Sequence, residues 1–448
     1  MARSRPRVAP ERRTRIDLLI SALIIVVVLM AGAVIWWFSP VRHTTSDRAH
    51  RVVPAAKPAT TVPAALVPLW QAPSAATTVA ALSRSLVITG DDGSVIGRDP
   101  ATGSQVWRYH RNRRLCAVLG AWRDSHDTVL SVYGNSRGCG EVTALDGDTG
   151  ARTGARTSDA DDAVNLAGGS GYVLAQGRTR LETWGTNLVR GIEYGRVDAP
   201  VKPDAQPQRT GCDISSAVLG ADRLALIEHC DDDSGYRLTV LGVNQDDDEK
   251  VRQFGSTIIT RGTADGPPPA VVAMSSSAIA VYDGGANPPE PDTAPAADAA
   301  TPRRAAIRQF STDGVQRRTN TVNGPRALPA ANAAITSDGL TTFWTGSATV
   351  VLDAGSMRPA FQVPGTLGPG QIMAGKLLLP IASGISVRDP ATMRETRTIR
   401  YPRAGYDKAS HDKAGHDKET DRMITLRVLG ERIVEQWGST VAVYGPPA

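Results

Sequence analysis

The chain has 448 residues, enough for a large hydrophobic core, and its charge is unevenly distributed. The formal net charge of +5 would by itself suggest nucleic-acid binding. Six arginines and one acidic residue lie before Ile16, however, and they account for this excess. The remainder of the chain is near neutral, so we expect no basic surface for nucleic-acid phosphates and no nucleic-acid partner.

The first predicted element is a transmembrane signal-anchor helix over residues 18–38. This stretch contains no charged residue, and at about 1.5 Å per residue it spans a bilayer core of about 30 Å. It is longer than the apolar region of a cleaved signal peptide and ends in aromatic residues that suit a membrane interface. The arginines precede it, so we predict a cytoplasmic basic tail over residues 1–17. The sequence thus predicts a single-pass protein of the cell membrane with its remaining residues outside the cytoplasm.

Three segments have the composition of linkers. Residues 39–64 are rich in Pro, Ala and Thr without helical or strand periodicity, which predicts a flexible stalk. Residues 284–304 and 404–422 are rich in Pro or in mixed charges, and we predict that both are disordered insertions. They interrupt an extracytoplasmic domain that we place at residues 65–448.

A repeated pattern of short strands and tight turns fills this domain. Residues 86–109 contain an apolar strand, an Asp-Gly turn, a second strand, a turn at 99–103 and a third strand with Trp107. Related turns recur at 145–150, 352–357 and 388–393. An Asp side chain can accept hydrogen bonds from backbone N–H groups two or three residues later, and Gly supplies positive φ. The residues assigned to this turn motif are Asp99, Thr102, Gly103, Asp146, Thr149, Gly150, Asp353 and Asp389.

The spacing of the repeats predicts the number of blades. Seven full units have outer strands near residues 106–109, 151–157, 191–197, 251–258, 315–322, 359–363 and 395–401. Three further strands follow, at 424–429, 432–437 and 440–444, and the fourth is supplied by residues 65–70. A ring closed in this way leaves no open blade edge. We therefore predict an all-β fold, an eight-bladed β-propeller, with seven blades as the alternative.

The cysteines test this arrangement of strands. Cys116 and Cys139, and likewise Cys212 and Cys230, fall at the start of a first strand and in the following second-to-third turn. Adjacent antiparallel strands bring these positions together, and neither other connectivity does so. Outside the cytoplasm pairing is expected, so we predict disulfides Cys116–Cys139 and Cys212–Cys230.

The repeat is similar to the pyrroloquinoline-quinone-like (PQQ-like) propeller repeat of quinoprotein alcohol dehydrogenases and of the outer-membrane assembly lipoprotein BamB. The similarity is good at residues 91–107 and fair at 144–150 and 388–393. The Ala-, Arg- and Pro-rich composition with an N-terminal anchor resembles membrane-anchored actinobacterial members. Quinone-binding members have adjacent cysteines and a calcium site, but this chain has no adjacent cysteines. The tryptophan docking motif survives only as Trp107, with Trp70 and Trp437 in looser positions, and we interpret these tryptophans as core or interblade packing residues. We expect no cofactor, metal ligand or catalytic residue.

These features favour a non-catalytic scaffold or assembly factor of the cell envelope that binds an envelope or membrane protein. The alternative is a small-molecule sensor or a vestigial quinoprotein-type enzyme with its ligand in the propeller funnel. Two acidic runs, at 231–233 and 246–249, lack the spacing of a calcium loop. We interpret them as solvated turns.

Overall fold

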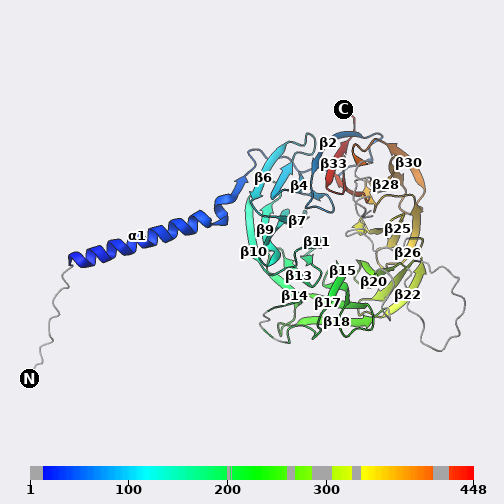
Figure 1. Cartoon of the computed structure of the whole chain (residues 1–448). Helices are drawn as coiled ribbons and strands as arrows, with labels where there is room; N and C mark the ends of the chain where they lie inside the picture. The colour runs from blue at the N-terminus through cyan, green and yellow to red at the C-terminus, as the bar shows by residue number, and fades with distance from the viewer. Residues whose placement is uncertain are drawn as a thin grey trace, which may run out of the picture.

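The structure is a computed structural model that describes residues 14–198, 202, 204–259, 268–284, 305–324, 334–406 and 423–447. Helix α1 (Arg15–Phe38) leads into eight sheets arranged around a central axis (Figure 1). The fold is an eight-bladed β-propeller, as predicted, and the seven-bladed alternative is wrong. Apart from residues 284 and 404–406, the two predicted insertions lie outside the described residues.

Helix α1 is long and apolar enough to cross a membrane, with a mean hydropathy of 3.1. It begins with a capping box in which the Thr14 and Asp17 side chains bond each other's backbone N–H groups. All of its side chains are exposed. In a folded domain such a surface would be buried, so α1 is compatible with single-pass membrane anchoring.

Blades 1 to 4 each contain four antiparallel strands, numbered from the centre outwards. They are β3 (Ala81–Leu82), β4 (Val87–Asp91), β5 (Ser94–Arg98) and β6 (Gln105–Arg111); β7 (Leu115–Ala121), β8 (Thr128–Asn135), β9 (Gly138–Asp146) and β10 (Arg152–Thr157); β11 (Asn165–Gly168), β12 (Tyr172–Gln176), β13 (Arg180–Gly185) and β14 (Arg190–Gly195); and β15 (Asp213–Leu219), β16 (Arg223–His229), β17 (Arg237–Gln245) and β18 (Val251–Ile258).

Blades 5 to 8 repeat this order. They are β19 (Ala270–Met274), β20 (Ala278–Asp283), β21 (Ala306–Ser311) and β22 (Gln316–Thr321); β23 (Ala334–Ser337), β24 (Leu340–Trp344), β25 (Ala348–Asp353) and β26 (Pro359–Pro364); β27 (Gln371–Met373), β28 (Lys376–Ile381), β29 (Gly384–Arg388) and β30 (Glu395–Arg400); and β31 (Thr425–Leu429), β32 (Arg432–Trp437), β33 (Thr440–Gly445) and β2 (Val67–Pro73).

The ring is closed by strands from both ends of the chain. Strand β2 pairs antiparallel with β33, from Val67 opposite Gly445 to Pro73 opposite Thr440. It is the outermost strand of blade 8, where its two prolines need no partner on the open side. The predicted closing strand is therefore confirmed, although it extends to residue 73.

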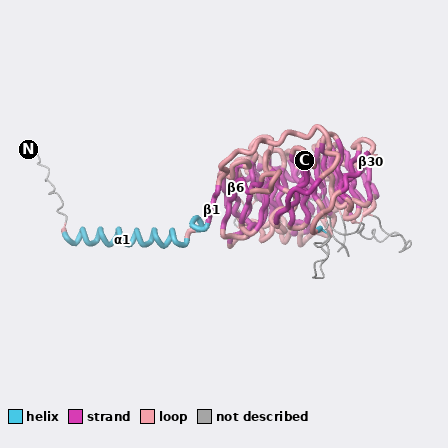
Figure 2. The backbone as a smooth tube through the Cα atoms, turned by 90° about the horizontal axis from the view of Figure 1, so that it is seen from above, coloured by secondary structure: helices cyan, strands magenta, loops and turns pink. Residues whose placement is uncertain are grey.

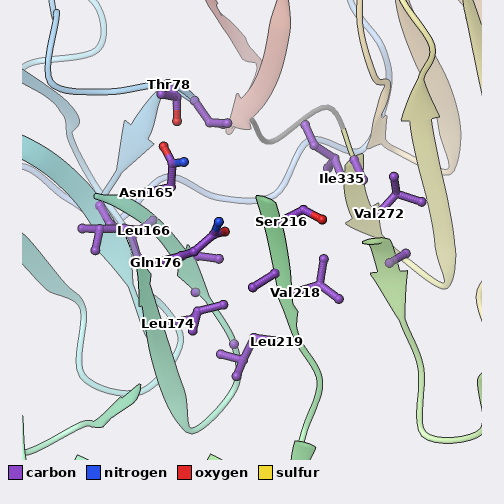
Figure 3. Close-up of a pocket in the computed structure, with 18 of the residues that line it drawn as sticks. Thr78, Asn165, Leu166, Leu174, Gln176, Ser216, Val218, Leu219, Val272 and Ile335 are labelled. Atoms are coloured by element: carbon purple, nitrogen blue, oxygen red, sulfur yellow. The ribbon is translucent and has the colours of Figure 1, made fainter. Parts of the chain in front are cut away.

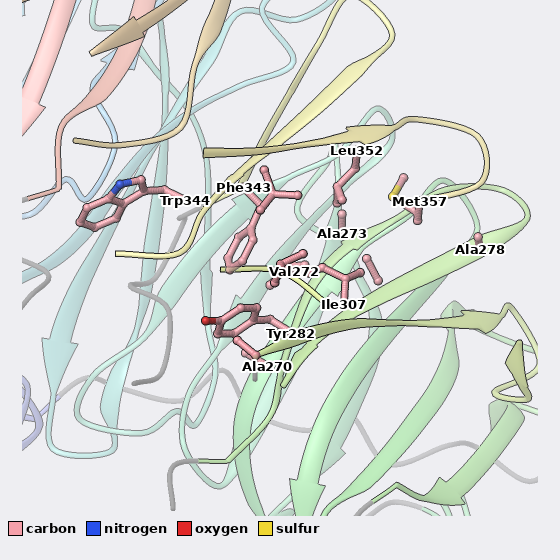
Figure 4. Close-up of a cluster of buried hydrophobic side chains, with 14 of the residues drawn as sticks. Ala270, Val272, Ala273, Ala278, Tyr282, Ile307, Phe343, Trp344, Leu352 and Met357 are labelled. Carbon is pink, nitrogen blue, oxygen red and sulfur yellow. The ribbon is translucent and has the colours of Figure 1, made fainter. Parts of the chain in front are cut away.

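The hydrophobic core is divided among the interfaces between blades. The described residues form eight buried clusters, one between each pair of neighbouring blades. Between blades 5 and 6, Tyr282 packs against Phe343 with ring centroids 5.1 Å apart (Figure 4). Each blade is covered on both faces by its two neighbours. Its inner strands, such as β16, are therefore buried on both faces and contain continuous apolar runs.

The predicted stalk is instead attached to the propeller. Residues 44–47 form strand β1 (Thr44–Asp47), which pairs with β6 and gives blade 1 a fifth strand. Residues 48–64, here called the strap, then cross one face of the ring. Backbone hydrogen bonds join Ala49 to Thr149 and Ala56 to Arg84, and Arg397 donates to the carbonyl groups of Val62 and Pro63.

The strap seals three interfaces between blades. Its apolar side chains pack against the clusters between blades 1 and 2, 8 and 1, and 7 and 8: Ala49, Val53, Ala56, Ala59 and Val62. The strap contacts separate positions on different blades, so its sequence shows no helical or strand periodicity. For this reason its Pro-rich composition predicted a flexible linker.

Substitution of Arg397 should test whether the strap stabilises the ring. We expect Arg397→Ala to lower the free energy of unfolding by about 1.5–3 kcal/mol, because two hydrogen bonds from a charged donor are lost. Arg51→Ala is the matched control: Arg51 pairs with Asp99 but its side chain is 64% exposed, so the loss should stay below about 1 kcal/mol. Chemical unfolding of the two variants measures both. Equal losses would contradict a stabilising strap.

Candidate functional site: the central channel

The innermost strands enclose a channel with a volume of about 750 Å³. Two faces are distinguished by their residues: the strap face carries the turns at 99–103 and 146–150, and the disulfide face carries both disulfides. The lining reaches from Ser170 and Ser276 at the strap face to Thr78 and Cys116 at the disulfide face. The cavity therefore runs through the ring, and blades 2 to 6 supply most of its wall.

The channel wall is mostly aliphatic with a few polar groups. Figure 3 shows two amide side chains, Asn165 and Gln176, beside aliphatic side chains from strands β11, β12, β15, β19 and β23. The aliphatic lining includes Leu166, Leu174, Val218, Leu219, Val272 and Ile335. Part of the polar lining is already occupied, since the Ser216 hydroxyl accepts a hydrogen bond from the Val271 backbone at 2.9 Å. Such a surface is suited to an apolar ligand oriented by a small number of polar contacts.

Arg427 is the one charged side chain among the described residues that line the channel. Burial among the walls, together with the nearby charge of Arg123, lowers its pKa to about 10. It therefore stays protonated at neutral pH. Arg427 donates to a neutral partner, the Gln371 side-chain oxygen at 3.3 Å, and Gln371 in turn donates to Ser337. A cation held by a neutral partner in an aliphatic channel favours a ligand with an anionic group.

The repeat turns have the predicted geometry but lie on the strap face, away from the channel wall. In each of the four turns an Asp side-chain oxygen accepts from backbone N–H groups two or three residues later, and its carbonyl accepts from the residue four later. Asp146, for example, accepts from Thr149 N at 2.8 Å. Such hydrogen bonds lower the pKa of the Asp353 carboxyl group, and the largest contribution comes from the Ser356 side chain. The motif residues thus form turns and do not meet at one site.

Two of these turns hold a tryptophan from the preceding blade. Trp107 of blade 1 donates to the Gly147 carbonyl of blade 2 at 3.0 Å, and its ring covers Gly150. Trp70 of β2 does the same in blade 1, where it donates to Pro100 at 3.2 Å and covers Gly103. Trp70, which the sequence placed in a looser position of the motif, is therefore a second docking tryptophan.

In other turns a large residue takes the place of the small turn glycine. Met357 and Met393 replace the turn glycine, keep its positive φ of 55° and 57°, and are buried between blades. In blade 3 the corresponding residue is Leu188, with φ 63°, which packs toward Gly154 of the preceding outer strand. The space between two blades is thus filled either from the outer strand or from the turn. This exchange explains why the repeat looks decayed in sequence.

Both predicted disulfides are present. Cys116–Cys139 and Cys212–Cys230 have Cα–Cα distances of 6.0 and 3.9 Å. Each fixes the start of an inner strand to the neighbouring hairpin on the disulfide face. Glu228 lies close to Cys212 and Cys230, but the two sulfurs bond each other and Glu228 accepts hydrogen bonds from Tyr194 and Arg209.

The acidic runs have structural partners. Asp233 pairs with Arg237. Burial acts to raise the pKa of the Asp233 carboxyl group, but the hydrogen bond with Arg237 is the largest of the effects that lower it, and the pKa is lowered overall. Asp246 accepts from the backbone of Asp248 and Lys250 within its own turn. These contacts agree with the interpretation of both runs as turns.

Two buried clamps that no sequence motif indicated join neighbouring blades. Glu435 on β32 accepts from the Tyr401 hydroxyl at 2.6 Å and from Arg403 at 2.8 Å. Glu228 on β16 is held in the same way by Tyr194 and Arg209. Burial, and then the charge of Glu435, raise the pKa of Tyr401. A single acid within a short apolar run was the available signal, because a buried carboxylate must be paired.

No family model matches the chain, and no curated protein matches its sequence. Solved structures do match. The crystal structure of the computationally designed protein Ika8 is 15% identical over 84% of this chain and 98% of its own, with a TM-score of 0.51. The dihydro-heme d1 dehydrogenase NirN in complex with DHE is 12% identical over 72% of this chain and 65% of its own, with a TM-score of 0.45.

The WD40 domain of Neurospora crassa Pan2 is 10% identical over 75% of this chain and 90% of its own, with a TM-score of 0.41. At 15% identity the likeness to Ika8 shows a shared fold and no activity.

The docking of Trp107 on Gly150 can be tested by a double-mutant cycle. Gly150→Ala should cost about 2–4 kcal/mol, because positive φ is strained and the new Cβ lies 2.7 Å from the indole ring. Gly375→Ala is the matched control: its φ is also +69° but nothing lies within 4 Å, so about 1–2 kcal/mol is expected. In a Trp107→Ala background, the cost of Gly150→Ala should fall to the control value when measured by chemical unfolding. An unchanged cost would rule out the docking contact as its cause.

Proposed function

We propose that the chain is a non-catalytic binding scaffold of the cell envelope, anchored by α1 with its N-terminus in the cytoplasm and its propeller outside. The apolar α1 and the arginines before it support this orientation. The two disulfides suit an oxidising compartment. The turn geometry and the two docked tryptophans support descent of the blades from the PQQ-like repeat.

The composition of the channel wall is the observation that supports binding rather than catalysis. Its described lining combines aliphatic side chains, hydroxyl and amide groups, and Arg427. General acid–base chemistry generally uses a carboxylate, imidazole, thiol or amine near its working pH. The channel instead offers shape, apolar area and one permanent cation. We propose that it holds a protein segment that presents an apolar side chain beside a carboxylate.

Photo-crosslinking should identify the partner. A photoreactive residue at Asn165 or Ser170, both exposed in the channel, should give the same envelope-protein adduct in intact cells. The same residue at Thr319, on the outer strand of blade 5, is the control and should not. Arg427→Ala should weaken the adduct strongly, because a hydrogen bond to a charged group contributes about 1.5–3 kcal/mol. Adducts that are absent at both channel positions, or equal at Thr319, would contradict the proposal.

A small-molecule sensor or a vestigial quinoprotein-type enzyme is the second candidate function. It is favoured by the channel volume of about 750 Å³, which lies within the usual range for ligand pockets of about 300–1,000 Å³.

A thermal-shift screen with quinones, calcium and cell-wall sugars tests this second candidate. A ligand at about 100 times its Kd should stabilise the propeller by about 2.7 kcal/mol. Arg427→Gln should remove the shift for an anionic ligand and leave the unliganded transition in place. A shift that survives in Arg427→Gln would mean that the ligand binds elsewhere.

A further inference from the structure

The connection between α1 and the propeller is much shorter than the sequence suggests. Five residues, 39–43, separate the end of α1 from β1. A chain of this length reaches at most about 17 Å, whereas a free stalk over residues 39–64 would reach about 90 Å. The pairing of β1 with β6, which runs from Thr44 opposite Arg111 to Asp47 opposite Arg108, fixes where this short connection ends.

The connection also folds back on the end of the helix. The Arg42 guanidinium lies 3.8 Å from the centroid of the Trp37 ring and 5.2 Å from that of Trp36. Tryptophans at the end of a membrane helix lie at the level of the lipid headgroups. The outer edge of blade 1 is therefore held close to that level.

The two views agree on the direction of the helix. In Figure 1, α1 leaves the ring from the outside of blade 1, and in Figure 2 it extends roughly in the plane of the ring. A helix that crosses the bilayer in this arrangement places the channel axis along the membrane surface. Both faces of the propeller then remain open to the surrounding compartment.

The charge of this edge suits an anionic surface. The described outermost strands of the blades contain eight arginines and three acidic residues: Arg152, Arg156, Arg190, Arg252, Arg317, Arg318, Arg397 and Arg400, with Asp47, Glu193 and Glu395. Near β1, Arg48 and Arg152 are exposed, and neither forms an ion pair with a described residue. The Ala49–Thr149 hydrogen bond brings the chain segments of these two arginines together.

We propose that the propeller stands on its edge on the membrane, with blades 1 and 2 against anionic lipid headgroups. The proposal rests on the proposed anchoring through α1. Attraction between the arginines and anionic lipids supplements the positional constraint of the short connection. This attraction is screened beyond about 10 Å at 0.1 M salt.

Site-specific quenching tests the orientation. The full chain, in vesicles of phosphatidylglycerol with a headgroup-attached quencher, carries a fluorophore at one introduced cysteine. Thr45→Cys on β1 should be quenched several-fold more than Thr319→Cys on blade 5, which lies opposite in the ring. Ser170→Cys on the strap face and Ser383→Cys on the disulfide face, each a quarter turn from blade 1, should be quenched weakly and equally.

The outcomes separate anchoring from orientation. A chain that does not float with the vesicles contradicts the proposed anchoring. A chain that floats but shows equal quenching at residues 45 and 319, or much stronger quenching on one face, overturns the edge-on orientation.

Charge reversal tests the lipid contact. Arg48→Glu with Arg152→Glu should reduce the quenching at residue 45, and Arg317→Glu with Arg318→Glu on blade 5 is the matched control that should not. An unchanged signal in the first pair, or equal quenching in vesicles of phosphatidylcholine, overturns the role of anionic lipid.

Discussion

The pairing of β2 with β33 is the interaction on which the rest of the structure depends. Each blade buries apolar surface against both of its neighbours, so an open array would expose two cluster-forming faces at its ends. Closing the ring removes both at once. It joins residues near the start of the domain to its last strand, and the eight clusters between blades then form a continuous ring.

Closure also explains the course of the strap. The chain must travel from β1 on blade 1 to β2 on blade 8, and it does so across the strap face, past the interface that closure creates. Ala56 packs against the cluster between blades 8 and 1. The same segment therefore connects the membrane helix to the ring and covers its joint, so a force on α1 is transmitted to blade 1 before it reaches β2.

In the function that we propose, the channel and the outer edge have different roles. The outer edge holds the molecule at the membrane, and the channel presents an aliphatic wall with one cation. The buried clamps and docked side chains make the contacts between blades. Few side chains of the channel wall are therefore needed to hold the ring together. Ring packing then tolerates variation in the channel lining, which is where binding specificity would reside.

The sequence by itself favoured eight blades over seven, and it predicted the closing strand and the disulfide pairing. Each follows from local signals: alternating strands, turns such as Asp99–Gly103, and the antiparallel order that places Cys116 beside Cys139. Only the tertiary structure decided the course of the strap, the clamps at Glu435 and Glu228, the docking of Trp70 on the first turn and the position of Arg427 in the channel. These features depend on side chains that converge from different blades, and their contacts leave no period in the sequence.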